Sequence, residues 1–434
     1  MFQILYKILY PLVFFLTWPF WILRDLIHRK PYCFKPRFLG PGRMLPKRQG
    51  RPRVWLWALS LGEVLAAKNL VPALEEAGAE VVISSTTAIG REAAARTLPG
   101  RLVLASPLDF SLSTRRFVDA VDPDLLVLVE TDIWPGILSR LSRRGVPAVL
   151  VSARMSPRSQ RGYSYIRPFW GRVLRLFDFI TTQSEDSRCQ ILNLGADPAR
   201  TMVIGDLKFD RPVRETTPEI QAALLAETGW PQGRWIVAGS THAGEDEIIL
   251  GAFNGLKRKD PAKYRDLKLL LAPRNRSDFL AVWDLIQCQK LPAGHRGAPA
   301  PDDRDKDVFL LDTMGELDRF YDLAEIALVG KSWAGLHKGG GHNPLEPAAK
   351  GKPVIFGPLT HNYRWMTKAL LEAGGGLMAP DQDALAGALE DLLDNPDKAR
   401  DMGRRAAYFV RTHQGGVRKT MDLLRPLLER ARSR

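Results

Sequence analysis

The chain has 434 residues, of which 45% are hydrophobic and 25% are charged, and its formal net charge is +14 at pH 7. This composition is typical of a globular protein of about two domains and excludes a disordered or fibrous chain. The charge favours an anionic partner, such as a phospholipid surface or an acidic substrate. No nucleic-acid partner is expected, because finger-like Cys/His spacing, an aromatic RNA-binding strand motif and a concentrated basic recognition helix are all absent from the sequence.

The first 23 residues are almost entirely apolar, with Lys7 as the one charged side chain. Such a stretch is about as long as a membrane-spanning helix needs to be. Pro11 and Pro19 would kink the helix, so it either spans the bilayer or lies in one leaflet. Positive residues follow, which predicts that the body of the protein stays in the cytoplasm. We expect residues 1–30 to be a membrane anchor; the competing interpretation is a hydrophobic helix docked on the protein's own core.

A first domain is expected over residues 31–212. Its buried strand 54–58 runs into a helix, and Glu63 falls in the first turn of that helix. Open α/β sheets place their active sites at this carboxyl edge of the strands. Glu63 is therefore either a site residue or only a partner of the helix dipole, and the sequence around it favours neither interpretation.

Strands and helices continue to alternate through the first domain. Glu130 follows strand 125–129, and Arg154 follows strand 146–152. The guanidinium of Arg154 either holds a phosphate or headgroup, or is a solvated loop charge. This alternation predicts a parallel sheet covered by helices on both faces. The other expected strands are 80–85, 101–105, 179–184 and 201–205.

A second domain is expected over residues 213–414, where the alternation restarts. Strand 235–239 ends in Ser240 and Thr241 just before a helix. These hydroxyls and the nearby backbone N–H groups suit a phosphate, although an N-capping cluster has the same pattern. Arg274 follows the next expected strand along the chain. Its planar guanidinium is suited to pairing with a phosphate or a carboxylate. Residues 415–434 are expected to form a closing helix.

A glycine-rich stretch lies near the middle of the second domain. Strand 326–329 is followed by a run containing Gly340 and Gly341, then by Asn343, which with the proline after it suits a helix start. Glycines allow backbone N–H groups to approach an anion, and a helix N-terminus adds partial positive charge. Glu346, in the first turn, is placed to accept hydrogen bonds from a ribose. We interpret this stretch as a phosphate site, the alternative being an ordinary strand-to-helix turn.

The two halves together predict two doubly wound α/β domains facing across a cleft. The sequence has no Walker-type phosphate loop and no strand-linked GxGxxG, so a nucleotide triphosphatase or dinucleotide enzyme is not indicated. It also lacks HExxH and an acidic metal cluster. We therefore expect no cofactor and no tightly bound metal.

In their order and spacing, the motifs along the chain resemble those of the bacterial Kdo transferases, and the resemblance covers most of the chain. Those enzymes are inner-membrane glycosyltransferases of the two-domain GT-B fold, which move 3-deoxy-D-manno-octulosonic acid (Kdo) from CMP-Kdo to lipid A precursor. The motifs that carry the resemblance are SLGE at 60–63, VETDIWP at 129–135, ARMS at 153–156, GDLKFD at 205–210, GSTH at 239–242, APR at 272–274, DTMGEL at 312–317 and GHNPLEP at 341–347.

The resemblance implies a role for individual residues. Glu63 matches the general base of an inverting, metal-independent transfer from CMP-Kdo to lipid IVA in lipopolysaccharide biosynthesis. The implied location is the cytoplasmic face of the cell inner membrane. Residues expected on the donor side are Ser240, Thr241, Arg274, Met314, Gly315, Gly340, Gly341, Asn343 and Glu346. Residues expected to bind the acceptor or support the base are Glu130, Arg154 and Lys208.

Three positions depart from the family pattern near these sites. Trp57 and Asn275 stand where the family usually has histidines, and Lys331 stands where it usually has a glycine. These departures leave the exact sugar and acceptor open. The alternatives are a divergent GT-B transferase that uses another nucleotide-activated sugar, and a catalytically weak membrane-bound paralogue that binds lipid.

Overall fold

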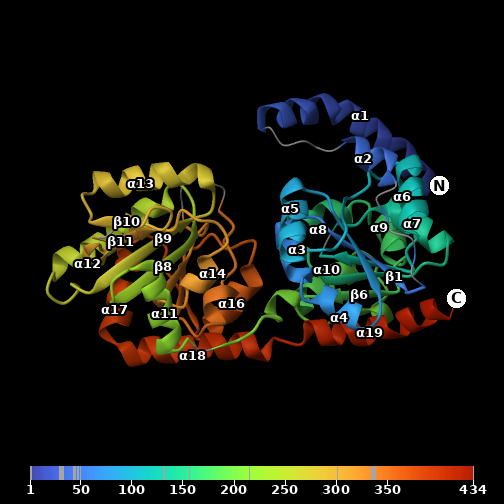
Figure 1. The fold of residues 1–434 in the computed structure, drawn as a ribbon. Helices are drawn as coiled ribbons and strands as arrows, with labels where there is room; N and C mark the ends of the chain where they lie inside the picture. Colours follow the sequence, from blue (N-terminus) through green and yellow to red (C-terminus); the bar gives the residue numbers. More distant parts are fainter. Residues whose placement is uncertain are drawn as a thin grey trace. The chain divides into compact units, whose positions relative to one another are not determined.

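The structure of the protein is a computed structural model that describes residues 2–28, 34–42, 45, 48, 50–130, 132–155, 157–214, 216–300, 302–333 and 339–433. Thr131, in the VETDIWP motif, and Ser156, in the ARMS motif, lie outside these residues, as do residues 334–338 before the glycine run. The chain folds into two compact units (Figure 1). Unit 1 comprises Met1–Asp210 and His413–Arg434, and unit 2 comprises Arg211–Thr412.

Unit 1 is built on a parallel sheet of seven strands in the order β3-β2-β1-β4-β5-β6-β7. The strand order reverses at β1, so the carboxyl ends of β1 and β4 flank a topological switch point, where open sheets bind ligands. The strands are β1 (Arg53–Ala58), β2 (Glu80–Ser85), β3 (Val103–Ala105), β4 (Leu125–Val129), β5 (Ala148–Ala153), β6 (Phe179–Thr182) and β7 (Thr201–Val203).

The strands of unit 1 are apolar on both faces because helices cover both. In β1, Leu56 faces one core cluster while Trp55 and Trp57 face the other. The first cluster is closed by α3 (Leu61–Ala67), α4 (Leu70–Glu76), α5 (Ala88–Thr97) and the C-terminal α19 (Gly416–Arg432). The second is closed by α6 (Ser111–Val121), α7 (Pro135–Arg143), α9 (Arg167–Leu174) and α10 (Glu185–Asn193). Shorter helices are α2 (Phe34–Leu39) and α8 (Pro157–Ser164), with 3-10 turns at Pro198–Arg200 and Leu207–Phe209.

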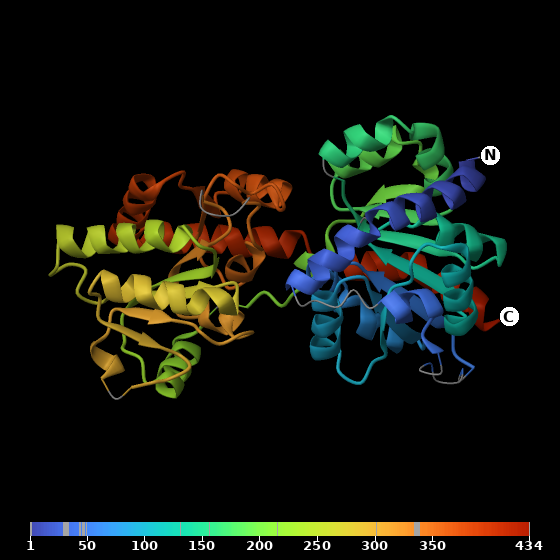
Figure 2. The same cartoon turned by 90° about the horizontal axis from the view of Figure 1, so that it is seen from above.

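The N-terminal helix α1 (Phe2–His28) lies against unit 1 (Figure 2). Tyr6 donates a hydrogen bond to Asp109 (2.7 Å), and the ring of Tyr10 packs on Phe110 and Trp134. In the part of the chain that the structure describes, no helix combines the length and apolar character needed to cross a bilayer. The expectation that residues 1–30 form a membrane anchor is therefore not supported as a spanning helix, and the helix docks on the protein, as in the competing interpretation.

Unit 2 repeats the architecture with a second parallel sheet of seven strands, in the order β10-β11-β9-β8-β12-β13-β14. The prediction of two doubly wound α/β sheets is thus confirmed. The three-residue edge strands β10 and β14 were not expected from the sequence. The strands are β8 (Arg234–Thr241), β9 (Leu267–Pro273), β10 (Ala293–His295), β11 (Val308–Leu310), β12 (Ala324–Val329), β13 (Val354–Phe356) and β14 (Gly376–Met378).

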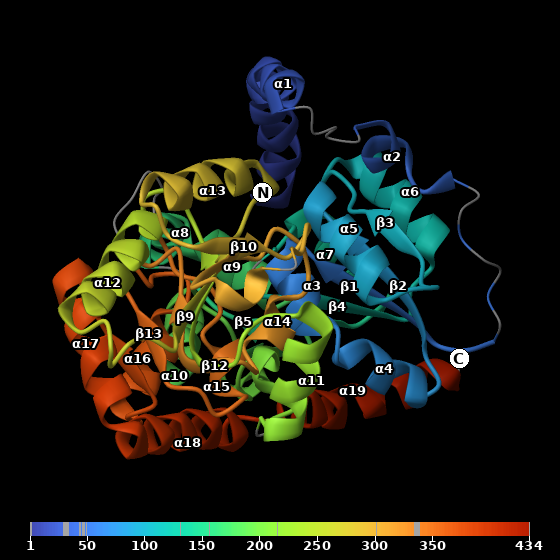
Figure 3. The same cartoon turned by 60° about the vertical axis from the view of Figure 1, so that its left-hand side comes forward.

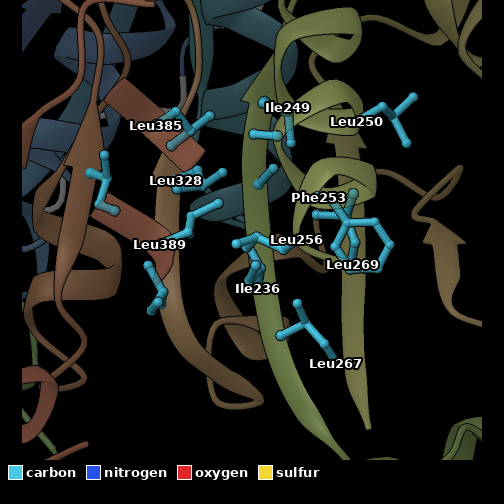
Figure 4. Packing of buried hydrophobic residues seen from close by; sticks show 14 of the residues in the cluster. Ile236, Ile249, Leu250, Phe253, Leu256, Leu267, Leu269, Leu328, Leu385 and Leu389 are labelled. Atoms are coloured by element: carbon cyan, nitrogen blue, oxygen red, sulfur yellow. The ribbon is translucent and has the colours of Figure 1, made fainter. Parts of the chain in front are cut away.

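The core of unit 2 also alternates about its central strands. Ile236 and Leu269 face α12 (Glu245–Lys259) and α17 (Gln382–Asp394), as Figure 4 shows. Trp235 faces the opposite layer, where it stacks with Trp230 after α11 (Pro218–Thr228). Figure 3 shows the remaining helices of this unit. These are α13 (Phe279–Cys288), α14 (Leu317–Phe320), α15 (Leu345–Ala348), α16 (Arg364–Glu372) and α18 (Pro396–Thr412), with 3-10 turns at Arg276–Asp278 and Asp303–Asp305.

Candidate active site

Glu63 lies in the first turn of α3, directly beyond the carboxyl end of β1. The residue is only 5% exposed, and one carboxylate oxygen accepts the backbone N–H of Leu59. Burial raises the pKa of Glu63 to about 8, and the nearby negative charge of Glu130 adds to this shift. A carboxyl group with a pKa in this range is able to accept a proton at neutral to mildly basic pH, as a general base must.

Glu130 is a second buried carboxylate, at the end of the neighbouring strand β4. Its backbone is left-handed (φ 61°), and its side chain is only 2% exposed. It accepts hydrogen bonds from Arg154 Nε (2.7 Å) and Lys208 Nζ (2.5 Å). Burial pushes the pKa of Glu130 upward, but the charges of Lys208 and Arg154 outweigh it and hold the pKa below its usual value. Glu130 is therefore an ionised anchor for two cations, and the three supporting residues predicted from the sequence do come together.

Asp132 forms a third carboxylate at this edge, which the sequence analysis did not single out as a site residue. Its Oδ2 accepts Trp57 Nε1 (2.7 Å) and Thr86 Oγ1 (3.1 Å). Trp57, Thr86 and Asp132 come from or follow three adjacent strands, β1, β2 and β4. Burial raises the pKa of Asp132, and the indole and hydroxyl donors beside it, led by Trp57 and Thr86, oppose that rise. The signal available in the sequence was the acidic residue placed soon after a strand end.

In unit 2, the turn after β8 is tied to the first turn of α12. Thr241 is fully buried, and its hydroxyl donates to Asp246 Oδ1 (2.7 Å). Ser240 next to it is partly exposed and has a left-handed backbone (φ 58°). The Thr241 side chain therefore serves the turn itself, although not as an N-cap, because the cap position of α12 is Gly244 and no side chain caps it. Contact of Ser240 and Thr241 with a donor remains a prediction.

A buried carboxylate joins this turn to the loop after β12. Glu245 is fully buried and accepts the backbone N–H groups of His242 and of residues 331–333, at 2.6 to 2.9 Å. On the same pair of loops, His242 Nε2 and His342 Nε2 lie 3.0 Å apart with their rings stacked. The sequence analysis used both histidines as motif members but assigned them no role.

The glycine run of unit 2 forms a folded turn rather than an open row of amides. The N–H of Gly340 donates to Leu359 O, that of Gly341 to Lys331 O, and that of His342 to Gly330 O. These amides are thus already bonded within the protein, so the amide cradle predicted from the sequence is not formed by them. That Gly340 and Gly341 lie against the donor remains a prediction. Their positive φ angles, 119° and 75°, explain why the turn requires glycine.

The helix after the glycine run is a single turn, α15, which begins at Leu345. The expected N-cap Asn343 lies one residue further from it, with Pro344 at the cap position. Asn343 nevertheless acts on this turn, because its Oδ1 accepts the N–H of Leu345 (3.2 Å) and its Nδ2 approaches Glu346 Oε1 (3.5 Å). Glu346 also lies 3.9 Å from Arg211.

Arg274 lies just beyond the carboxyl end of β9, and its backbone N–H donates to Thr241 O (2.9 Å). Within the described residues, its guanidinium has no hydrogen bond or ion pair. Met314 is 38% exposed, and Gly315 beside it has a positive φ of 93° with open space on its Cβ side. These residues follow strands β9 and β11, so the carboxyl edge of the second sheet carries an available cation and an exposed turn.

The predicted site residues therefore fall into two groups, each at the carboxyl edge of one sheet. Unit 1 holds the carboxylates and their cations, and unit 2 holds the donor-side set. Among the residues that the structure covers, no group of three or more His, Cys, Asp or Glu side chains is arranged to hold a metal ion.

Comparison with known proteins places these features in a family. The family described as "3-Deoxy-D-manno-octulosonic-acid transferase (kdotransferase)" matches residues 34–211. The 3-deoxy-D-manno-octulosonic acid transferase of Haemophilus influenzae is 35% identical over 392 residues, which are 89% of this chain and 88% of the relative. The enzyme of the same name from Bordetella pertussis is 36% identical over 399 residues, 89% of this chain and 90% of the relative. The chain belongs to the Kdo transferase family.

As a member of the Kdo transferase family, the chain is a glycosyltransferase. A solved glycosyltransferase from Rickettsia africae has a TM-score of 0.57 and 14% identity, and the match covers 87% of this chain and 99% of that chain. At this identity the likeness concerns the fold alone, and it agrees with two doubly wound sheets of the GT-B kind. The resemblance inferred from the motifs is confirmed at the level of the family.

Proposed function

We propose that this Kdo transferase family member moves Kdo from CMP-Kdo to lipid A precursor, lipid IVA, in lipopolysaccharide biosynthesis. The acceptor hydroxyl attacks the anomeric carbon of Kdo, the bond from that carbon to the phosphate oxygen breaks, and CMP leaves with the electron pair. The proton of the hydroxyl passes to Glu63. One displacement of this kind inverts the anomeric centre.

The observation that carries this proposal is the environment of Glu63. It is a buried carboxylate with a pKa of about 8 at the switch point of the sheet, beside an ionised Glu130. A glutamate that served only as a partner of the helix dipole would have an ordinary or lowered pKa, because the dipole favours its charged form. Perturbed carboxyl groups at a strand edge are typical of catalytic sites.

The donor side of the proposal rests on the carboxyl edge of the second sheet. Arg274 offers a planar cation for the phosphate, and Asn343 and Glu346 offer an amide and a carboxylate for the ribose. The exposed Met314 and the open Gly315 suit a flat base. Neutralising the charge on departing CMP with such a cation lowers the barrier of the transfer.

The function is tested by incubating purified full-length protein with CMP-Kdo and lipid IVA and measuring the mass of the lipid. A mass gain of one or more Kdo units is expected. Glu63→Ala should abolish transfer and leave the Kd for CMP unchanged, because Glu63 lies in unit 1 and the donor residues lie in unit 2. The exposed Glu92→Ala is the matched control and should retain full activity.

Three results would contradict parts of this proposal. Transfer of a different sugar from a panel of nucleotide sugars would favour a divergent GT-B transferase. Tight binding of lipid IVA with no turnover would favour a lipid-binding paralogue. Near-normal turnover by Glu63→Ala would remove Glu63 from the role of base.

We further propose that the protein works on the cytoplasmic face of the anionic inner membrane. The supporting observation is the outer face of α1, which exposes a set of large apolar side chains, and α1 packs beside α7. Helix α7 and its C-cap carry Arg140, Arg143 and Arg144, with Arg115 close by on α6. An apolar helix face next to basic residues suits anionic lipid headgroups. The exposed α1 residues are Ile8, Leu9, Leu12, Val13, Phe15, Leu16 and Phe20.

Sedimentation with lipid vesicles tests the membrane proposal. The full chain should bind vesicles that contain phosphatidylglycerol more tightly than vesicles of phosphatidylcholine alone. Replacing Leu16 and Phe20 by aspartate should weaken binding about tenfold or more, since each loses buried apolar area and adds a negative charge. Tyr408→Asp, on the exposed face of α18, is the control. Equal binding by all variants would contradict a role for α1.

A further inference from the structure

The carboxyl ends of β1 and β4 are neighbours at the switch point of the first sheet, and each is followed by a carboxylate. Glu63 follows β1 on α3, in the layer on one side of the sheet, while Asp132 follows β4 and leads into α7, in the layer on the other side. The two carboxyl groups are close enough for the charge of Asp132 to raise the pKa of Glu63. Open α/β sheets bind their ligands at such a switch point, and a ligand bound there would be flanked by both groups.

The Asp132 carboxylate is held in one orientation by donors from two other strands. Trp57 Nε1 and Thr86 Oγ1 both donate to Oδ2, at 2.7 and 3.1 Å. Trp57 is 1% exposed, and its indole is fixed by the packing of the α6 and α7 layer. Among the described residues, both hydrogen bonds of normal geometry to this carboxylate go to Oδ2. The Trp134 indole lies near enough to lower the pKa of Asp132, but its buried Nε1 makes no hydrogen bond of normal geometry, so Oδ1 keeps its capacity to accept one. When one oxygen of a buried carboxylate already accepts two hydrogen bonds, the other oxygen is the one that can accept a hydrogen bond from a ligand.

We propose that Asp132 binds the acceptor, with Oδ1 accepting a hydrogen bond from a sugar hydroxyl adjacent to the hydroxyl that Glu63 deprotonates. This inference rests on the proposed transfer to a lipid-linked sugar. Vicinal hydroxyls are a feature of sugar acceptors, and two carboxylates flanking one crevice match two neighbouring hydroxyls. Glu63 takes the proton that the attacking hydroxyl loses. Asp132 orients the acceptor sugar ring so that the attacking oxygen points at the anomeric carbon of the donor.

Trp57 is the positioning residue in this arrangement. An indole N–H is a donor only and does not titrate, so Trp57 keeps Oδ2 engaged throughout the working pH range. Asp132 in this chain therefore offers Oδ1 to the acceptor at any pH where Glu63 is active.

This geometry makes Asp132→Asn an unusually sharp test. Trp57 Nε1 can only donate, so the new side-chain amide must turn its oxygen toward Trp57 and its NH2 group toward the acceptor. The substitution thus replaces an acceptor by a donor at one point while keeping size and shape. We expect kcat/KM for lipid IVA and its direct binding constant to worsen about tenfold or more, with the Kd for CMP unchanged.

The double variant Trp57→Phe with Asp132→Asn tests whether the defect of Asp132→Asn is relieved when the indole N–H is removed. With the indole N–H removed, the hydroxyl of Thr86 is able to accept from the amide, so the amide can flip and return its oxygen to the acceptor. We expect the double variant to regain about threefold or more over Asp132→Asn alone. Trp57→Phe alone should cost less than Asp132→Asn, and the exposed Asp186→Asn should change nothing.

The outcomes separate this inference from the proposed function. Wild-type transfer to lipid IVA establishes the function, and Asp132→Asn with wild-type kcat/KM and lipid IVA affinity would then overturn the role of Asp132. Loss of activity with equal loss of thermal stability and CMP affinity would also overturn it, because the carboxylate would then serve only the fold. If the wild type neither binds nor alters lipid IVA, the acceptor proposal fails and this inference fails with it.

Discussion

Glu63 has an elevated pKa because it is buried and faces like charges, and the role of base that we propose for it predicts a catalytic rate that depends on pH. With a pKa of about 8, roughly one-tenth of the molecules carry an ionised Glu63 at pH 7. A base works in its deprotonated form, so kcat/KM should rise with pH and level off above about 8.

Two substitutions should move this pH dependence in opposite directions. Glu130→Gln removes a charge that raises the pKa of Glu63, so the rise in rate should shift to lower pH. Lys208→Met removes a charge that lowers the pKa of Glu63, so the rise should shift to higher pH. The pH profile of kcat/KM measures both. Shifts of the same sign, or none, would show that the rate does not report the ionisation of Glu63.

At the scale of residues, the sequence revealed positions but not partners. Glu63 was found because its place in the first turn of a helix is a local pattern. The bond from Trp57 to Asp132 joins residues 75 apart in the sequence, and that from Thr86 to Asp132 joins residues 46 apart. Pairings of this kind depend on strand order, which periodicity does not reveal. The buried Glu245 that gathers the loop at 331–333 was missed for the same reason.

Among the elements, α1 and α7 are joined by one buried carboxylate. Asp109 accepts the Tyr6 hydroxyl (2.7 Å) and the N–H groups of Gly136 (2.7 Å) and Ile137 (2.8 Å) in the first turn of α7. The loop just before that turn carries Asp132. Docking of α1 therefore bears on the segment that we propose binds the acceptor.

Tyr6→Phe should loosen α1 without unfolding unit 1. The lost hydrogen bond to a buried carboxylate is worth about 1–3 kcal/mol, while the aromatic contacts of the ring remain. We expect faster proteolysis within residues 2–28 and a small fall in Tm. Tyr165→Phe, at a residue that is 83% exposed, is the matched control. Unchanged proteolysis in Tyr6→Phe would show that the aromatic packing alone holds the helix.

The elements themselves were largely predictable, because long apolar strands alternate with amphipathic helices. Strands β2 and β4 match their expected residues 80–85 and 125–129, and β1 begins one residue before its expected range of 54–58. The edge strands β10 and β14 were missed, since three residues carry too little pattern to be recognised. The expected membrane anchor is not supported as a spanning helix among the described residues, and an aromatic residue of this helix, Tyr10, packs on Phe110 and Trp134 of the protein itself.

For the molecule as a whole, the two units differ in how the chain builds them. Unit 2 is one continuous segment, whereas unit 1 is completed by residues 413–434. In α19, Met421, Leu424, Leu427 and Leu428 are buried in the same core cluster as Leu56 of β1. Asp210 accepts the backbone N–H groups of Gly415 and Val417 and so fixes the start of this helix.

Deleting residues 413–434 should unfold unit 1 and spare unit 2. Four buried apolar side chains contribute about 6–12 kcal/mol, which is comparable to the whole stability of a typical domain. Limited proteolysis of the truncated chain should yield a resistant fragment close to residues 211–412. That fragment made alone should unfold cooperatively. A truncated chain whose first unit resists protease would contradict the role of α19.

The division of unit 1 has a consequence for how the protein is made. Between Asp210 and His413 the ribosome must add about 200 residues, which takes roughly 10–40 s at bacterial translation rates. During that interval the nascent first sheet lacks the helix that seals its apolar face, while the later-made half has everything it needs to fold. The half of the enzyme that is translated first is therefore the last to mature, and it is the natural client for a chaperone on the emerging chain.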